Sequence, residues 1–251
     1  MAEEVSFAVY RYRPGDKPYY AAYSVPVARG MTVLDALTYI KENLDTTLAF
    51  RASCRMGICG SCGMMLNGFP HLACHTQVDE VRGKGKKIEV APLAHFPVVR
   101  DLVVDLGPLF AKHRAVRPYI LEAGEGEESR QLPEELERYL QFAYCLKCGS
   151  CWAACPTAAT DAHFLGPQAL AQAYRYLADT RDRGGGTRLA LVAQSEGAWR
   201  CHFAGNCSKA CPKGVDPALG VQLLKRALVR LPAKKAVVAT AVSSAAKKEA
   251  G

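Results

Sequence analysis

The stretch Cys54-Arg-Met-Gly-Ile-Cys59-Gly-Ser-Cys62 places three cysteines within nine residues of a 251-residue chain. The chain has 11 cysteines, and they fall into three groups. Beyond the quoted stretch they are Cys74, then Cys145, Cys148, Cys151 and Cys155, then Cys201, Cys207 and Cys211. The N-terminus is acidic and has no apolar run, so we expect neither a secretory signal nor a disulfide framework. Clustered cysteines in such a chain predict metal ligands.

The spacing of the first group is typical of one kind of centre. Its pattern, C-x4-C-x2-C followed by the distant Cys74, is that of plant-type [2Fe–2S] sites. Gly57 and Gly60 allow the backbone to turn its N–H groups toward the cysteine sulfurs. We therefore expect Cys54, Cys59, Cys62 and Cys74 to bind a [2Fe–2S] cluster. A four-cysteine zinc site is the alternative, although zinc sites usually combine two C-x2-C pairs.

The residues around this group predict a small β-rich domain. Residues 5–12 and 20–27 are rich in β-branched and aromatic side chains and are expected to form strands, with residues 88–90 as the last strand. Residues 32–35 have the pattern of a helix capping box. After it, an apolar stripe recurs at helical spacing: Val33, Leu34, Leu37, Ile40 and Leu44. This order of elements predicts a β-grasp ferredoxin domain over residues 1–100.

The second and third groups share one motif. Residues 145–156 form a complete C-x2-C-x2-C-x3-C-P run, the signature of bacterial ferredoxins. Residues 201–212 repeat it with Ala204 in place of the second cysteine. In two-cluster ferredoxins the fourth cysteine of such a run binds the other cluster.

This exchange of ligands predicts two different clusters. A [4Fe–4S] cluster would take Cys145, Cys148, Cys151 and Cys211. The other cluster would take Cys155, Cys201 and Cys207, and because Ala204 cannot bind iron we expect it to be [3Fe–4S]. All 11 cysteines are then used. A four-iron cluster with a non-cysteine ligand, or cysteines that are simply buried thiols, are the alternatives.

The second half of the chain is expected to be helical. Three apolar stripes are predicted: Leu136, Leu140 and Ala143 after Pro133; Leu170, Ala173, Tyr174 and Leu177; and Leu219, Leu223, Leu224, Ala227 and Leu228 after Pro217. With a boundary near residues 97–105, residues 101–232 form an all-helical two-cluster ferredoxin domain, and residues 233–251 a low-complexity Ala/Lys-rich tail. The fold class is α+β.

Charge and hydropathy exclude several classes of protein. The formal net charge is +8, but oxidised clusters with their thiolates contribute roughly −2 each, which leaves about +2. Together with the absence of any RNA- or DNA-binding motif, this argues against a nucleic-acid partner. No glycine-rich phosphate-binding loop follows a predicted strand, so no nucleotide or flavin site is expected. No apolar stretch approaches the roughly 20 residues of a membrane span.

With these motifs, the chain resembles the iron–sulfur subunits of succinate dehydrogenase and fumarate reductase (respiratory complex II). The resemblance extends from about residue 5 to about residue 230. It rests on a combination of segments: residues 53–62, 100–105, 166–167, 179–183 and 200–202, besides the two cysteine runs.

The resemblance implies a function and a set of partners. Such a subunit passes electrons one at a time between a flavoprotein subunit with covalently bound FAD, which interconverts succinate and fumarate, and a membrane quinone. Membrane-anchor subunits, often with a haem b, hold the complex. The expected location is therefore peripheral, at the cytoplasmic face of a prokaryotic cell membrane. The pattern leaves open whether the complex oxidises succinate or works as a quinol:fumarate reductase.

The resemblance also implies quinone-side residues, which map onto Pro156, Thr157, His202 and Lys225. His202 would donate a hydrogen bond to the quinone, with structural packing under the cluster as the alternative. For Lys225 the alternative is a solvated cation. Members that use ubiquinone often have a tryptophan where this chain has Thr160, so menaquinone is the expected quinone.

Two alternatives from other classes stay open at this point. Electron-transfer subunits of other quinone-linked or disulfide-reducing complexes carry paired C-x2-C-x2-C-x3-C-P runs. The second alternative is a zinc-stabilised interaction module without a redox role.

Overall fold

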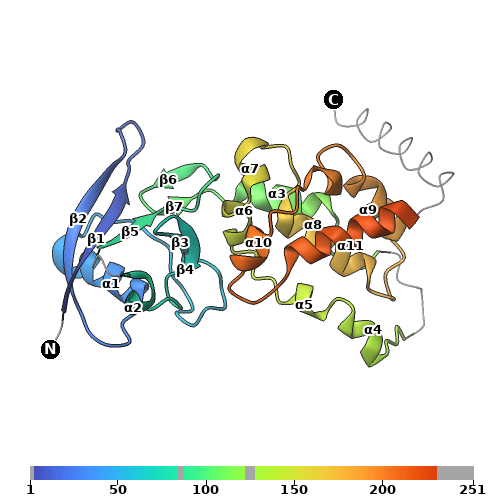
Figure 1. Cartoon of the computed structure of the whole chain (residues 1–251), viewed down its shortest axis with the longest axis horizontal. Helices are drawn as coiled ribbons and strands as arrows, with labels where there is room; N and C mark the ends of the chain where they lie inside the picture. Colours follow the sequence, from blue (N-terminus) through green and yellow to red (C-terminus); the bar gives the residue numbers. More distant parts are fainter. Residues whose placement is uncertain (1–2, 84–86, 122–127, 231–251) are drawn as a thin grey trace. The chain divides into compact units, whose positions relative to one another are not determined.

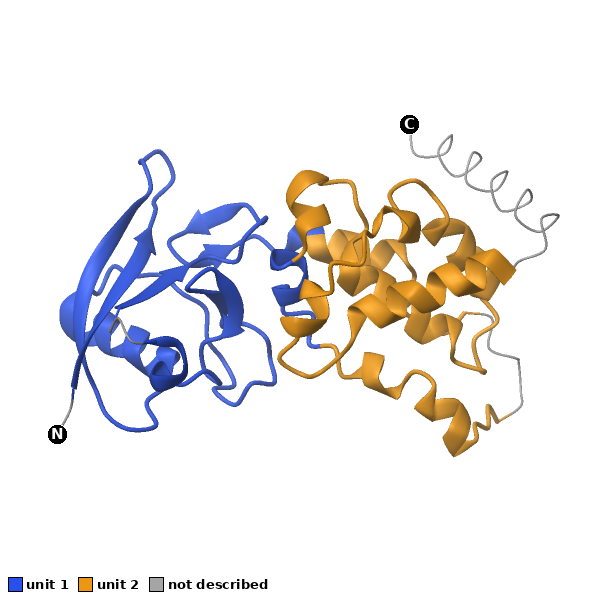
Figure 2. Cartoon of the chain, in the orientation of Figure 1, with its two compact units in different colours: residues 1–108, 146–154 blue, residues 109–145, 155–251 orange. Residues whose placement is uncertain are grey.

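A computed structural model describes residues 3–83, 87–121 and 128–230. The chain forms two compact units (Figures 1 and 2). Unit 1 consists of residues 1–108 and 146–154, and unit 2 of residues 109–145 and 155–251. The cysteine run at residues 145–155 is thus divided between them. The predicted tail, residues 233–251, lies outside the described residues.

Unit 1 is built on a five-stranded sheet with the order β2-β1-β5-β3-β4. Its strands are β1 (Glu3–Arg11), β2 (Tyr19–Val27), β3 (Gly63–Leu66), β4 (Phe69–Leu72) and β5 (Lys87–Ala91). β1 pairs antiparallel with β2 and parallel with β5, so the first and last strands of this sheet are neighbours. This confirms the expected β-grasp-like layout. Residues 88–90 are not the last strand of the chain, however, because a small hairpin of β6 (Val98–Arg100) and β7 (Val103–Val104) follows.

Helix α1 (Val33–Tyr39) covers the sheet and begins at the predicted capping box. The Thr32 hydroxyl accepts a hydrogen bond from the Asp35 N–H at 3.2 Å, and the Asp35 carboxylate accepts one from the Thr32 N–H at 3.0 Å. The prediction that Leu44 continues the buried stripe was wrong, since its side chain is 48% exposed. Residues Ile40–Leu44 form a π-helical turn, and its wider winding turns Leu44 away from the sheet.

A buried charge network in unit 1 was not foreseen from the sequence. Arg11 is only 4% exposed, and its guanidinium pairs with Asp45 and, at 3.0 Å, with Asp101. Asp101 also accepts a hydrogen bond from the Ala49 N–H at 2.9 Å. Burial, with a further contribution from the hydrogen bond to Asp45, raises the pKa of Tyr23 to about 12. The network ties the segment that leads into the first cysteine group to strand β1.

Unit 1 also contains two short helices, α2 (Val78–Val81) and α6 (Ser150–Ala153). Among its described residues, unit 2 contains helices and loops but no strand. Its helices are α3 (Gly107–Ala115), α4 (Pro133–Glu137), α5 (Leu140–Ala143), α7 (Pro156–Thr160), α8 (Gly166–Leu177), α9 (Gly185–Val192), α10 (Asn206–Lys209) and α11 (Pro217–Arg230). Helices α8 and α11 form the centre of the unit. Gly220 permits their close approach, because a Cβ there would lie 3.3 Å from the Ala171 Cα and 3.0 Å from the Phe142 ring.

The predicted stripes of unit 2 needed two corrections. The helix expected after Pro133 breaks at Tyr139 (φ −133°) into α4 and α5. Tyr139 and Phe142 are therefore the buried residues, while Leu136 is 38% exposed. The break is stabilised because the Tyr139 hydroxyl donates to Gln131 at 2.7 Å. On α11, Leu219 lies on the outer face although Leu224 is buried. In the described ranges, no helix is both long and apolar enough to cross a lipid bilayer.

Candidate metal centres

The first cysteine group forms a loop whose N–H groups point at sulfur atoms. The Cys54 Sγ accepts hydrogen bonds from the N–H groups of Met56 at 3.4 Å, Ile58 at 3.3 Å and Cys59 at 3.3 Å. The loop is tightly curved, with positive φ at Arg55, Gly57 and Gly60. These hydrogen bonds, led by that of Met56, lower the pKa of Cys54 to about 6. The loop is therefore built to stabilise sulfur in its negatively charged form.

The remaining thiols of this group are reached from the same loop and from a hairpin. The Gly57 N–H donates to the Cys74 Sγ at 3.3 Å, and the Ser61 hydroxyl donates to the Cys59 Sγ at 3.1 Å. Strands β3 and β4 pair antiparallel, with Gly63 opposite Leu72, and this brings Cys62 beside Cys74. The Cys74 N–H lies 3.5 Å from the Cys62 Sγ. The residues between Cys62 and Cys74 thus form one hairpin, made of β3 and β4.

The four thiols differ in their surroundings. Cys59 is exposed, Cys54 is half-buried, and Cys62 and Cys74 are buried. Burial raises the pKa of Cys62 to about 12. A free thiol in that position would stay protonated, whereas bound iron keeps it as a thiolate. Four thiols with this set of N–H donors fit a [2Fe–2S] cluster.

Two cysteines of the second run belong to unit 1. Cys148 packs against the first loop, because a Cβ built on Gly60 would lie 2.8 Å from the Cys148 Cβ. Cys151 lies on α6. This helix is held in place by a hydrogen bond from the Trp152 indole N–H to the His95 carbonyl, at 3.1 Å. The Cys148 thiol donates to the Ser150 hydroxyl at 3.3 Å. The backbone of the first site therefore touches a predicted ligand of the second.

The two other predicted [4Fe–4S] ligands belong to unit 2. The Gln168 amide lies 3.9 Å from the Cys145 Sγ. Cys211 packs against the core cluster that contains Tyr139 and Phe142.

The three predicted [3Fe–4S] ligands line a single cavity in unit 2. Cys155, Cys201 and Cys207 lie on its walls, and so does Ala204. The Phe203 N–H donates to the Cys201 Sγ at 3.4 Å. Burial, with the neighbouring thiols Cys155 and Cys201, raises the pKa of Cys207 to about 11. Three thiols that line one cavity, with the methyl group of Ala204 in the fourth position, fit a cluster with three protein ligands.

The residues predicted on the quinone side lie around the same cavity. Pro156, Thr157 and His202 line it, with His202 exposed and Thr157 buried. Lys225 does not line it and is not a fully solvated cation. Its ammonium group donates to the Cys201 carbonyl at 2.8 Å and lies 5.9 Å from the centre of the Trp199 ring.

Two exposed aromatic side chains lie on either side of Cys201 in the sequence and were missed by the sequence analysis. Trp199 is 50% exposed and Phe203 58% exposed. The sequence could have singled them out, because each is two residues from the predicted ligand Cys201.

Comparisons with known proteins agree with this arrangement. Residues 6–111 match a family model described as a 2Fe-2S iron-sulfur cluster binding domain, and residues 141–215 one described as a 4Fe-4S dicluster domain. Both descriptions name iron–sulfur clusters, so the zinc alternative finds no support.

Whole-chain relatives carry two related names. The fumarate reductase iron-sulfur subunit of Mycobacterium tuberculosis is 47% identical over 232 residues, which cover 90% of this chain and 93% of the relative. The subunit of the same name in Haemophilus influenzae is 43% identical, covering 85% and 88%. The succinate dehydrogenase iron-sulfur subunit of Paracoccus denitrificans is 41% identical, covering 89% and 87%.

A solved structure extends the likeness to the fold. A chain in the structure titled "Mycobacterium smegmatis Sdh1 complex in the apo form" superimposes with a TM-score of 0.83 and 26% identity, covering 91% of this chain and 96% of that one. Sequence motifs, the geometry of the thiols and relatives of matching length all agree. The chain belongs to the family of electron-transferring iron–sulfur subunits of fumarate reductase and succinate dehydrogenase.

Proposed function

We propose that this chain relays single electrons between a flavoprotein subunit with covalent FAD and a membrane quinone, through one [2Fe–2S], one [4Fe–4S] and one [3Fe–4S] cluster. The observation that supports this best is the cavity on which Cys155, Cys201, Cys207 and Ala204 meet. Three thiolates and one position without a ligand match a three-iron cluster. Bound clusters supply one-electron redox centres, which divide the two-electron chemistry of succinate and fumarate into single transfers.

The protein's own groups set the conditions at each centre. At the first, backbone N–H groups directed at Cys54 and Cys74 favour the negatively charged sulfurs. Hydrogen bonds to sulfur and exposure to solvent are the main means by which a protein tunes cluster potentials. At the third, Cys207 is buried, which shields one ligand from water. The [4Fe–4S] ligands would be Cys145, Cys148, Cys151 and Cys211, by the exchange of fourth cysteines that paired runs show.

On the quinone side, Pro156, Thr157, His202 and Lys225 are the proposed contacts. The exposed His202 has a ring N–H to donate to a quinone oxygen. Lys225, held by the Cys201 carbonyl, adds positive charge beside the third cysteine group. Negative charge that develops on a reduced quinone is stabilised by both.

The proposed partners are the flavoprotein and membrane-anchor subunits, and in some assemblies a haem b on the anchors. The solved relative is itself titled as a complex. With these partners the chain would lie at the cytoplasmic face of a prokaryotic membrane. It would serve succinate oxidation by quinone or, in the opposite direction, fumarate reduction by quinol.

The cluster assignment is tested by spin-quantified EPR on oxidised protein purified without oxygen. Oxidised [2Fe–2S] and [4Fe–4S] clusters are diamagnetic, so only a [3Fe–4S] cluster gives a signal. We expect about one spin per chain, because one cluster lacks a fourth thiolate. Absence of the signal from protein that is replete with iron would contradict the proposed ligand set.

We propose menaquinone as the quinone, because the residue at the position often held by tryptophan in ubiquinone-using members is Thr160. Its hydroxyl is engaged within its own helix, donating to the carbonyls of Pro156 at 3.3 Å and Thr157 at 3.2 Å. The assembled complex is expected to turn over faster with a menaquinone analogue than with a ubiquinone analogue. A strong preference for ubiquinone would contradict this proposal.

A further inference from the structure

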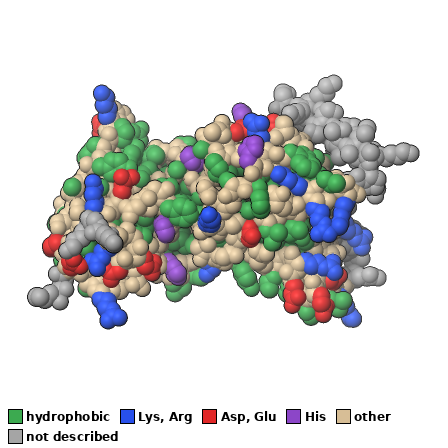
Figure 3. Space-filling view, viewed as in Figure 1, with side chains coloured by type: hydrophobic (Ala, Val, Ile, Leu, Met, Phe, Trp, Pro, Cys, Tyr) green, Lys and Arg blue, Asp and Glu red, His purple; other side chains and the backbone are tan. Residues whose placement is uncertain are grey.

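Unit 2 contains a large open groove that none of the 11 cysteines lines. Its volume is about 880 Å³, and it runs between α8, α11 and the end of α4. Its apolar lining includes Leu177 and Leu223, and Arg138, Arg226 and Arg230 also line it. Blue Lys and Arg side chains gather at the end of unit 2 where α11 ends (Figure 3). The volume is in the range of small-molecule sites.

Among the described residues, the three arginines of the groove have no acidic partner. None of them forms an ion pair with any residue of the described ranges. Arg226 and Arg230 are one helical turn apart on α11, so they share a face. Arg138 reaches the same groove from α4. Guanidinium groups that approach from two elements form a receptor for a group with more than one negative oxygen.

A tyrosine hydroxyl lies in the same groove as these cations. Tyr174 lines the groove, and its ring is fixed edge-on against Phe142 at 5.2 Å between centres. Burial raises its pKa, while the charges of Arg138 and Arg226 act in the opposite direction. Both cations therefore lie close enough to influence the hydroxyl. The hydroxyl has no partner among the residues that the structure describes, so it is available to donate to a ligand.

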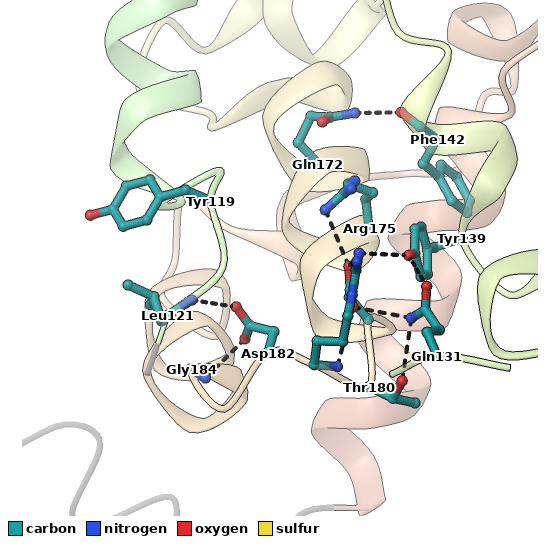
Figure 4. Close-up of polar contacts among 12 residues, drawn as sticks. Tyr119, Leu121, Gln131, Tyr139, Phe142, Gln172, Arg175, Thr180, Asp182 and Gly184 are labelled. Atoms are coloured by element: carbon teal, nitrogen blue, oxygen red, sulfur yellow. Dashed lines mark hydrogen bonds and ion pairs between the residues drawn. The ribbon is translucent and has the colours of Figure 1, made fainter. Parts of the chain in front are cut away.

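The acidic side chains at the groove do not cancel this charge, because each already has partners. Asp179 pairs with Arg181 at 2.8 Å and with Arg175 at 3.6 Å. Asp182 pairs with Arg188. Figure 4 shows that Asp182 also accepts hydrogen bonds from the N–H groups of Leu121 at 2.8 Å and Gly184 at 2.9 Å. Both carboxylates are fully buried. Counting only side chains that the structure describes, the groove keeps a net positive charge.

We propose that this groove binds an organic phosphate. The phosphate would lie between Arg138, Arg226 and the Tyr174 hydroxyl, because its oxygens match the forked donors of two guanidinium groups. An apolar or aromatic body attached to it would cover the leucine side chains. A free nucleotide and the headgroup of an anionic lipid both have this chemistry, and they are separated by the test. This site is independent of the clusters and of the proposed electron route.

The test is calorimetric titration of the full, cluster-loaded chain with four probes: adenosine diphosphate, short-chain phosphatidylglycerol, short-chain phosphatidylcholine and inorganic phosphate. We expect saturable binding of the diphosphate or of phosphatidylglycerol, and its identity distinguishes the two sources. Arg226→Gln and Arg138→Gln should each weaken that binding about tenfold or more, since each removes charge-assisted hydrogen bonds. Arg114→Gln removes the same charge from α3, away from the groove, and should leave the affinity within about twofold.

Three results would overturn the proposal. One is no saturable binding of either anionic organic probe. Another is an equal loss of affinity in Arg226→Gln and Arg114→Gln, which would indicate a general effect of charge. The third is inorganic phosphate or phosphatidylcholine binding as tightly as the best anionic organic probe. The EPR signals of the clusters are a separate readout, so failure of this site leaves the proposed electron-transfer role untouched.

Discussion

Replacing Ala204 with cysteine is expected to remove nearly all of the EPR signal of the oxidised protein. Ala204 lies on the cavity shared by Cys155, Cys201 and Cys207 and is itself exposed, so a thiol fits there without displacing core atoms. A fourth thiolate would retain a fourth iron, and an oxidised four-iron cluster gives no signal. The reduced protein should gain the signal of a second [4Fe–4S] cluster.

The same substitution should make the third cluster harder to reduce. An added thiolate brings negative charge, and net cluster charge is one of the factors that set reduction potential. Ala204→Val is the matched control, because it adds bulk without a ligand and should keep the three-iron signal. If Ala204→Cys retained the oxidised signal in full, the proposed position of the missing ligand would be wrong.

Replacing Gly60 with alanine is expected to disrupt both the first loop and the position of Cys148. Gly60 has φ +75°, and a Cβ there would lie 2.8 Å from the Cys148 Cβ and 3.1 Å from its Cα. The Cα is a backbone atom and not a flexible tip, so the two segments must move apart. We expect a loss of about 3 kcal/mol of unfolding free energy, from backbone strain and overpacking together.

The functional effect should be larger than the effect on stability. Cys148 is a proposed ligand of the second cluster, so its displacement should lower the iron content and reduce quinone turnover of the assembled complex about tenfold or more. Iron analysis measures the loss of iron, and EPR of the reduced protein measures the loss of the cluster. Thermal unfolding followed by circular dichroism measures the loss of stability.

Gly68→Ala is the control that separates strain from contact. Gly68 has φ +79°, but no atom lies within 4 Å of the position that a Cβ would take there. This variant should lose about 1 kcal/mol and keep its clusters and turnover, because it has the strain without the collision. If the two variants lost the same stability, iron content and turnover, the contact between Gly60 and Cys148 would not be needed for function.

Much of the β-rich unit was predictable because its signals are local. Strands β1 and β2, and the capping box at Thr32 and Asp35, depend on side chains that are close together in the sequence. The cysteine spacing likewise predicted the kind of centre, since the reach of a short loop limits which metals its thiols can bind.

Errors occurred where contacts outside a helix, or a change in its winding, override the regular apolar spacing. The helix predicted through Leu136 and Ala143 breaks because Tyr139 and Phe142 are drawn into contacts with residues outside it, Gln131 and Tyr174. Leu44 is exposed because a single π-helical turn shifts the register of the stripe. Neither the helix break nor the π-helical turn can be read from the spacing of apolar residues.

The family, the two kinds of ferredoxin motif and the absence of a thiol at Ala204 follow from the order of residues alone, because ligand spacing and residue chemistry are properties of the linear chain. Which groups meet across the chain depends on the tertiary structure. Folding brings Gly60 against Cys148, ties Lys225 to the Cys201 carbonyl, and leaves three arginines unpaired beside Tyr174 within the described residues. Such contacts join residues that lie dozens of positions apart, and packing determines whether their charges are neutralised or left free to bind.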